Sequence, residues 1–157
     1  MVTAERTIKV AVSKELAWKA IADFKNIHLF HPMVVQPPLL GDKEQGIGAV
    51  RRCDFKDKTS ILETIIDWQE GESLTVELTD MSMPLKKAQA TMRVSPAGSD
   101  ESFITLRMDF TPKGGLLGWV MGVVMMKPMV GMMFNKVLKS LSKHLLAENQ
   151  IPAPALS

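Results

Sequence analysis

One apolar run of the sequence carries a carboxylate whose position suits a chemical role. Glu63 alternates with Ile61 and Ile65, so the three side chains share one face of a predicted strand. If that face points inward, the carboxylate lies in an apolar cavity and can act as an acid, a base or a hydrogen-bond anchor. The alternative is an exposed glutamate that pairs with Arg51 or Arg52 across the hairpin.

Arg51 and Arg52 are consecutive in the preceding strand, so they point to opposite faces of it. One of them therefore faces the inner side of the sheet or its edge, where a guanidinium would pair with Glu63 or with an acidic ligand. The alternative is an exposed charge at a strand end. We take Arg51 as a candidate ligand-binding residue, although a shift of one residue in register would exchange the two.

His31 is the best candidate for proton transfer, because an unperturbed imidazole titrates near neutral pH. It follows a short predicted helix and precedes Pro32, at the expected mouth of a cavity. The alternative is a structural histidine that caps this helix. His28 lies nearby, but no third ligand at a suitable spacing accompanies the pair, so we expect neither a metal site nor a cofactor. Cys53 has no basic partner that the sequence can place, and we expect no nucleophilic role for it.

The composition excludes several classes of protein. The 157 residues fit one domain, and 46% hydrophobic with 23% charged residues is typical of a globular protein. Lys and Arg number 19 against 17 acidic residues, so we expect no nucleic-acid partner. A single cysteine excludes an intramolecular disulfide framework. The first residues do not resemble a secretory signal, and we expect a cytoplasmic protein.

The elements that must position these residues follow from hydrophobic periodicity. Alternation predicts a strand over 6–12, then a helix that Ser13 caps and a short helical turn over 26–30. Five further strands are predicted over 49–55, 59–68, 73–79, 87–94 and 103–110, and their short connections imply an antiparallel meander. A long apolar helix over 116–147, bent at Pro128, follows. We expect a single domain over 1–147 and a disordered tail over 148–157.

A long apolar helix against a curved sheet leaves a gap, which predicts an apolar cavity for a small molecule. Six of the 12 methionines lie between Met121 and Met133. Methionine adapts to varied apolar shapes, so we expect the helix to roof the cavity. The alternatives are simple core filling, or an exposed arm over 114–126 that contacts a membrane or a partner. The expected cavity wall consists of Leu78, Ala88, Ala90 and Met108 of the sheet and Met121, Met125 and Met129 of the helix, with Trp18, Trp68 and Trp119 in the core or the wall.

Several short segments, in this order, resemble the START-like, helix-grip (SRPBCC) superfamily within its polyketide cyclase/dehydrase branch. They are Ala17 to Phe24, His31-Pro32, Gly46 to Arg51, Glu63, Met83-Pro84-Leu85 and Met108 to Pro112. The resemblance covers about Val10 to Leu146. It implies an α+β helix-grip fold, in which a curved antiparallel sheet of six to seven strands wraps around a long C-terminal helix and two short N-terminal helices complete the domain.

The chain is similar, within that superfamily, to the plant abscisic-acid receptor-like subgroup. The resemblance places Lys56-Asp57-Lys58 at a gating loop and Met83-Pro84-Leu85 at a latch loop, which makes Leu85 a candidate ligand-binding residue, and Glu63 matches a pocket glutamate. The Gly-Leu-Pro pattern of the receptors' gate is absent from this sequence. No lysine stands near Val35, the place at which the resemblance implies a lysine that holds the acid group of the hormone. Hormone recognition is therefore not implied.

Three functions remain open at this stage. The first is binding, with transport or sensing, of a hydrophobic small molecule such as a lipid or a polycyclic compound. The second is a cyclase/aromatase-type enzyme in which Glu63 or His31 transfers a proton. The third is a membrane-surface or protein-interaction module that uses residues 116–133. Besides the small molecule, we consider two further partners: a membrane surface in weak contact, and a second copy of the chain in a homodimer.

Overall fold

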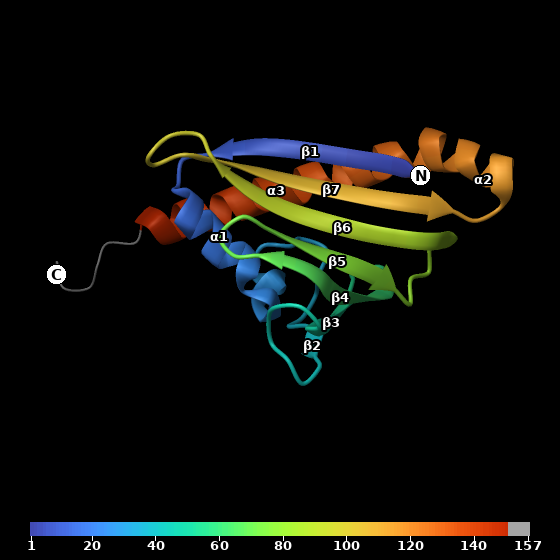
Figure 1. The fold of residues 1–157 in the computed structure, drawn as a ribbon, viewed down its shortest axis with the longest axis horizontal. Coiled ribbons are helices and arrows are strands. Elements are labelled where there is room, and N and C mark those ends of the chain that lie inside the picture. Colours follow the sequence, from blue (N-terminus) through green and yellow to red (C-terminus); the bar gives the residue numbers. More distant parts are fainter. Residues whose placement is uncertain (151–157) are drawn as a thin grey trace.

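Seven strands form one antiparallel sheet in the order β1-β7-β6-β5-β4-β3-β2 (Figure 1). The computed structural model describes residues 1–150. The connections from β3 to β7 are short, so these strands form a meander, and β1 then pairs with β7 along its whole length. The strands are β1 (Val2–Val10), β2 (Leu39–Leu40), β3 (Val50–Asp54), β4 (Ser60–Gln69), β5 (Ser73–Thr79), β6 (Leu85–Pro96) and β7 (Ser102–Pro112).

Two short helices connect β1 to β2. The helix α1 (Lys14–Ala22) begins as predicted, because the Ser13 side chain accepts a hydrogen bond of 3.3 Å from the backbone N–H of Leu16. A 3-10 helix, η1 (Phe24–Leu29), follows. The predicted first strand over 6–12 is displaced from the observed one, since the register with β7 starts at Val2.

The long C-terminal helix has three segments: α2 (Gly115–Met121), the π-helical turn η2 (Gly122–Met126) and α3 (Lys127–Gln150). In η2 the backbone N–H of Lys127 bonds to the carbonyl of Gly122. Only Lys127 separates this π turn from Pro128, which lacks the N–H that an α-helix would use there. The helix continues to Gln150 and so includes the first residues of the predicted tail over 148–157. Residues 151–157 lie outside the described residues.

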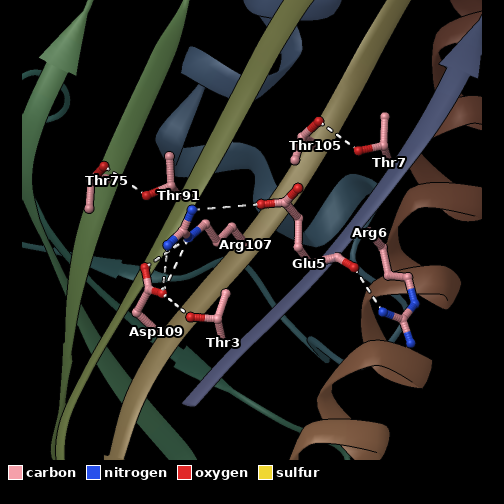
Figure 2. A network of polar contacts seen from close by, with 9 residues as sticks. All are labelled: Thr3, Glu5, Arg6, Thr7, Thr75, Thr91, Thr105, Arg107 and Asp109. Atoms are coloured by element: carbon pink, nitrogen blue, oxygen red, sulfur yellow. Dashed lines mark hydrogen bonds and ion pairs between the residues drawn. The ribbon is translucent and has the colours of Figure 1, made fainter. Parts of the chain in front are cut away.

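Three glycines let this helix pack closely against β1, the end of β7 and the residue that follows it. A Cβ atom at Gly118 would lie 1.7 Å from the carbonyl oxygen of Lys113, and one at Gly122 would lie 2.5 Å from Cγ of Pro112. Gly131 likewise lies against the guanidinium of Arg6, which points from β1 towards the helix in Figure 2. Larger side chains at these positions would push the helix away from β1 and β7.

The two faces of the sheet differ in polarity, as the predicted alternation requires. The inner face of β7 carries Ile104, Leu106, Met108 and Phe110, all buried, and Leu74, Val76 and Leu78 extend this face on β5. The outer face carries polar pairs such as Thr7 with Thr105, Thr75 with Thr91, and Arg107 with Asp109 (Figure 2). The core therefore lies between the inner face and α3.

The tryptophans occupy different environments. Trp18 is buried and packs edge-to-face against the half-buried Trp68, with 5.2 Å between ring centroids. Trp119 of α2 is 47% exposed, so its predicted place in the core or cavity wall is wrong. Figure 1 shows α2 at the opposite end of the molecule from α1.

Candidate functional site

A cavity of about 450 Å³ lies between the inner face of the sheet and α3. Its volume falls within the range of roughly 300–1,000 Å³ that is typical of small-molecule sites. Apolar side chains form most of its wall. The sheet contributes Ile61, Leu74, Val76, Leu78, Ala90, Met92, Leu106 and Met108, α3 contributes Met129, Val130, Met132, Met133, Phe134 and Val137, and the N-terminal segment contributes Ile27, Phe30 and Met33.

Arg51 and Glu63 form an ion pair in the wall, which also includes the charged residues Asp57, Arg107 and Lys136. The two residues of the pair are directly opposed in the β3–β4 register, and Glu63 is opposed to Leu78 on its other side. The Nε of Arg51 donates to Oε2 of Glu63, and the two side chains are 5% and 15% exposed. The guanidinium also donates from Nη1 to the carbonyl oxygen of Phe24 at 2.8 Å and lies 3.9 Å from the centroid of the Phe24 ring.

The structure shows which of the two consecutive arginines, Arg51 or Arg52, faces the cavity. Arg51 faces inward, whereas Arg52 is exposed and pairs with Asp54 on the outer side. Glu63 combines both sequence interpretations, because it lines the cavity and also pairs with an arginine across the hairpin. An ion pair can remain in an apolar wall where each charge neutralises the other and a further hydrogen bond, here from Arg51 to the Phe24 carbonyl, supports it.

Cys53 lies on the same inner face, next to this pair. The thiol donates a weak hydrogen bond of 3.9 Å to Oε2 of Glu63 and is 1% exposed. Burial raises the pKa of Cys53 to about 12, the negative charge of Glu63 adds to the effect, and Arg51 partly opposes it. A thiol with this pKa stays protonated at neutral pH and is a poor nucleophile.

His31 lines the cavity beside the ion pair. Burial lowers the pKa of His31 from 6.5 to about 4, Glu63 opposes this shift, and Arg51 reinforces it. The backbone N–H of Met33 donates to Nδ1 of His31 at 3.2 Å. A neutral imidazole that accepts at Nδ1 carries its proton at Nε2. His31 is therefore a neutral hydrogen-bond donor at pH 7.

Seven of the predicted site residues line this cavity: His31, Arg51, Glu63, Leu78, Ala90, Met108 and Met129. Leu85 and Ala88 do not line it and are instead buried in the core. Ala88 is opposed to Phe110, and the ring of Phe110 packs against Gly122. The helix is thus too close to the sheet there to leave a cavity.

The predicted places of Met121 and Met125 in the cavity wall are wrong. They are 48% and 61% exposed and do not line the cavity. Gly118, Gly122 and Met126 recur at four-residue steps and face the sheet, so Met121 and Met125 turn away from it.

Two loops and several apolar residues complete the wall. Asp57 lies in the loop that the resemblance compared with a gate, Met83 lies at the latch position, and Met81 lies two residues before it; all three line the cavity. The wall also contains residues that were not among the predicted site residues: Ile27, Phe30, Met33, Phe55, Ile61, Leu74, Val76, Met92 and Leu106. Alternation places Ile61 on the face of Glu63 and Val76 on the face of Leu78, and this signal could have added both to the predicted wall. Met132 and Met133 belong to the methionine group that was expected to roof the cavity, and they line it. Among residues 1–150, no three His, Cys, Asp or Glu side chains are grouped as a metal site would need.

Comparison with solved structures shows the same fold in proteins of low sequence identity. XoxI from Bacillus cereus aligns with a TM-score of 0.77 and 18% identity, over 96% of this chain and 99% of its own. A Thermobifida fusca protein aligns with a TM-score of 0.72 and 23% identity, over 92% and 93%. Norcoclaurine synthase from Thalictrum flavum, in complex with dopamine and hydroxybenzaldehyde, aligns with a TM-score of 0.71 and 15% identity, over 97% and 89%.

Comparison of sequences identifies the family. No curated protein sequence matches the chain. The model of one family, described as "Polyketide cyclase / dehydrase and lipid transport", matches residues 1–146. This match and the helix-grip fold agree with the resemblance that the sequence motifs suggested. The chain belongs to the polyketide cyclase/dehydrase and lipid transport family.

Proposed function

We propose that this protein binds a hydrophobic small molecule, a lipid or a polycyclic compound, in the cavity between the sheet and α3. The observation that carries the proposal is the cavity itself: about 450 Å³ with a wall that is mostly apolar and in which His31, Arg51 and Glu63 supply polar groups. Burial of apolar ligand surface in such a cavity supplies the affinity, and polar groups fix the orientation. The family description, which names lipid transport, supports the same class of ligand.

The polar groups favour a ligand with one polar end. The Arg51 guanidinium donates a hydrogen bond to Oε2 of Glu63. Within the described residues, Oε1 of Glu63 accepts no hydrogen bond. His31 offers an Nε2–H donor, and Glu63 offers an acceptor oxygen. A hydroxyl or amine group on the ligand can donate to Glu63, and a carbonyl or hydroxyl oxygen can accept from His31. A neutral ligand suits this end, because the ion pair already balances the two charges.

Proton transfer during ring closure, the enzymatic alternative, has less support. A histidine whose pKa is about 4 is a weak base at neutral pH. The carboxylate of Glu63 is held by Arg51 and by the Cys53 thiol. Norcoclaurine synthase shares the fold at 15% identity, which carries no active-site residue over to this chain.

The test is a titration with N-phenyl-1-naphthylamine, a neutral apolar fluorophore with one N–H donor. We expect saturable one-to-one binding with enhanced fluorescence. Ala90→Phe places a larger ring in the cavity and should weaken binding by about tenfold or more, because it removes space for the probe. Native mass spectrometry of the purified protein then reports any ligand that it retains.

Gln89→Phe is the matched control. Gln89 precedes Ala90 in β6 and is exposed on the outer face of the sheet. The same ring added there should leave probe affinity unchanged. Equal probe affinity in Ala90→Phe and in the wild type, with both folded, would place the binding site elsewhere and refute the proposal.

A further inference from the structure

A continuous apolar surface covers α2 and the π turn η2. Leu116 and Leu117 are 79% and 74% exposed, and Val124 and Met125 are 65% and 61% exposed. Single exposed apolar residues are normal on soluble proteins, but a contiguous group of this kind indicates a contact surface. We call these four residues, with Trp119 and Met121, the arm surface.

Close packing holds the arm surface in its outward orientation. Gly118 and Gly122 lie against Lys113 and Pro112, with no room for a Cβ atom. The helix therefore cannot rotate to bury its apolar side against the sheet, because that rotation would bring larger side chains to the glycine positions. The arm surface is a fixed part of the fold rather than a loose end.

Lysines surround the base of the arm. Lys86 and Lys87 follow Leu85 at the start of β6, where Lys87 is opposed to Thr111. The backbone N–H of Lys113 donates to the carbonyl of Pro84 at 2.9 Å. Lys86, Lys87, Lys113 and Lys127 are all exposed. No ion pair joins these four lysines to an acid within residues 1–150. The sequence between Asp109 and Glu148 contains no acidic residue.

The lysine charges favour an anionic membrane over a second copy of the chain as the partner of the arm surface. In a two-fold dimer the same patch meets itself, so the lysines of both copies would lie close together and repel each other. An anionic lipid surface offers the opposite charge and an apolar interior beneath it. The combination of an exposed apolar helix face with flanking lysines is typical of helices that lie in a membrane interface.

The length of the segment favours a flat orientation over a span. By length and composition the helix from Gly115 to Glu148 is apolar enough to cross a membrane. However, Val130, Val137, Leu141 and Leu145 of that helix are buried against the sheet. The uninterrupted apolar run over 116–126 rises about 16 Å, against about 30 Å for the hydrocarbon core.

We propose that the arm surface docks flat on an anionic membrane, with Leu117 and Val124 among the acyl chains and Lys86, Lys113 and Lys127 at the headgroups. Met129 and Met132 continue along the helix from Met121 and Met125, are themselves 54% and 61% exposed, and line the cavity. Docking thus brings the cavity opening next to the bilayer. The docking itself does not depend on the proposed ligand binding.

The test is flotation with vesicles of phosphatidylcholine alone and of phosphatidylcholine with about 30% phosphatidylserine. We expect the full chain to float with the anionic vesicles, to float less as salt rises, and to show a blue shift of Trp119 fluorescence. Leu117→Glu with Val124→Glu should abolish flotation. Lys86→Gln with Lys113→Gln should weaken it by about tenfold or more, since each lysine adds to the attraction.

Ile47→Glu is the control, because Ile47 is 56% exposed on a distant loop and should leave flotation unchanged. All variants should retain N-phenyl-1-naphthylamine binding, which separates this test from that of the proposed function. Absence of flotation by the wild type would overturn the proposal. So would sedimentation as a dimer that Leu117→Glu dissociates, since a second copy would then cover the arm surface.

Discussion

Arg51 and Glu63 face each other across β3 and β4, and their ion pair forms part of the cavity wall. Phe24 fixes the other side of the guanidinium through its ring and its carbonyl oxygen. The pair therefore connects η1 to the sheet and keeps the charge at the polar end of the cavity balanced. Several properties of the molecule should depend on this arrangement.

Arg51→Met should lower the free energy of unfolding by about 3 kcal/mol, because it leaves the Glu63 carboxylate without its partner in a nearly buried site. Urea denaturation measures the change. Arg52→Met is the control, since that side chain is 52% exposed, and it should cost less than about 0.5 kcal/mol. Similar losses for the two variants would show that the buried pair has no special weight.

The double variant Arg51→Met with Glu63→Leu should recover most of the stability lost in Arg51→Met. Apolar groups of similar volume then replace both charges, and no unpaired charge remains. The same denaturation experiment applies. A double variant less stable than Arg51→Met would mean that Glu63 stabilises the fold through contacts other than the pair.

Stability should fall as the pH falls from about 6.5 to about 4, in part because of His31. In this window the unfolded chain binds a proton at His31, whereas the folded protein, with a pKa of about 4, does not. The contribution is at most about 3 kcal/mol. His31→Asn should show a shallower loss of stability over this range. Equal slopes for wild type and variant, measured by urea denaturation at each pH, would contradict the burial of a neutral imidazole.

Cys53 should resist thiol reagents in the folded protein. At about pH 8 we expect reaction with Ellman's reagent to be more than a thousandfold slower than in the urea-unfolded chain, because burial keeps the thiol protonated and inaccessible. The rate should follow global unfolding as urea is added. Rapid labelling without urea would show that the wall next to Glu63 opens readily.

Gly118→Ala should destabilise the protein by about 2 kcal/mol, although Ala in a helix ordinarily stabilises relative to Gly. The new Cβ would lie 1.7 Å from the carbonyl oxygen of Lys113, so α2 must move. Trp119 emission should change with it. Gly98→Ala is the control, because its nearest neighbour would be 3.9 Å away. A stabilised Gly118→Ala variant would show that α2 does not pack as described.

Period-two alternation explains why the sheet could be predicted from the sequence. Leu74, Val76 and Leu78 have the same side inward because each strand has one buried face, and this requires no knowledge of the neighbouring strands. Arg51 and Arg52 could not be told apart, because both are charged and the choice depends on the register with β4. Alternation within a strand predicts which residues share a face. The pairing with the neighbouring strand decides which of two consecutive charged residues points inward.

For the first half of the C-terminal helix, the sequence pattern does not predict which side packs against the sheet. This half is apolar on all sides, so the positions of Met121 and Met125 carried no information about which side packs inward. Gly118 and Gly122 decide it, because close approach to Lys113 and Pro112 is possible only without a side chain. In α3 the lysines at 136, 139 and 143 mark the outer side, and the predicted inward residues Phe134, Leu138 and Leu141 are indeed buried.

The π turn over 122–126 sets the angular register between the two halves of the helix. Each residue of an α-helix turns the chain by about 100°, so deletion of one residue in this turn would rotate α2 by that angle relative to α3. The cavity wall on α3 would stay in place, while Leu117 would swing towards the sheet. The π turn, in which Lys127 donates to Gly122, and the close packing of Gly118 and Gly122 thus act together to set which way the apolar end of the molecule faces.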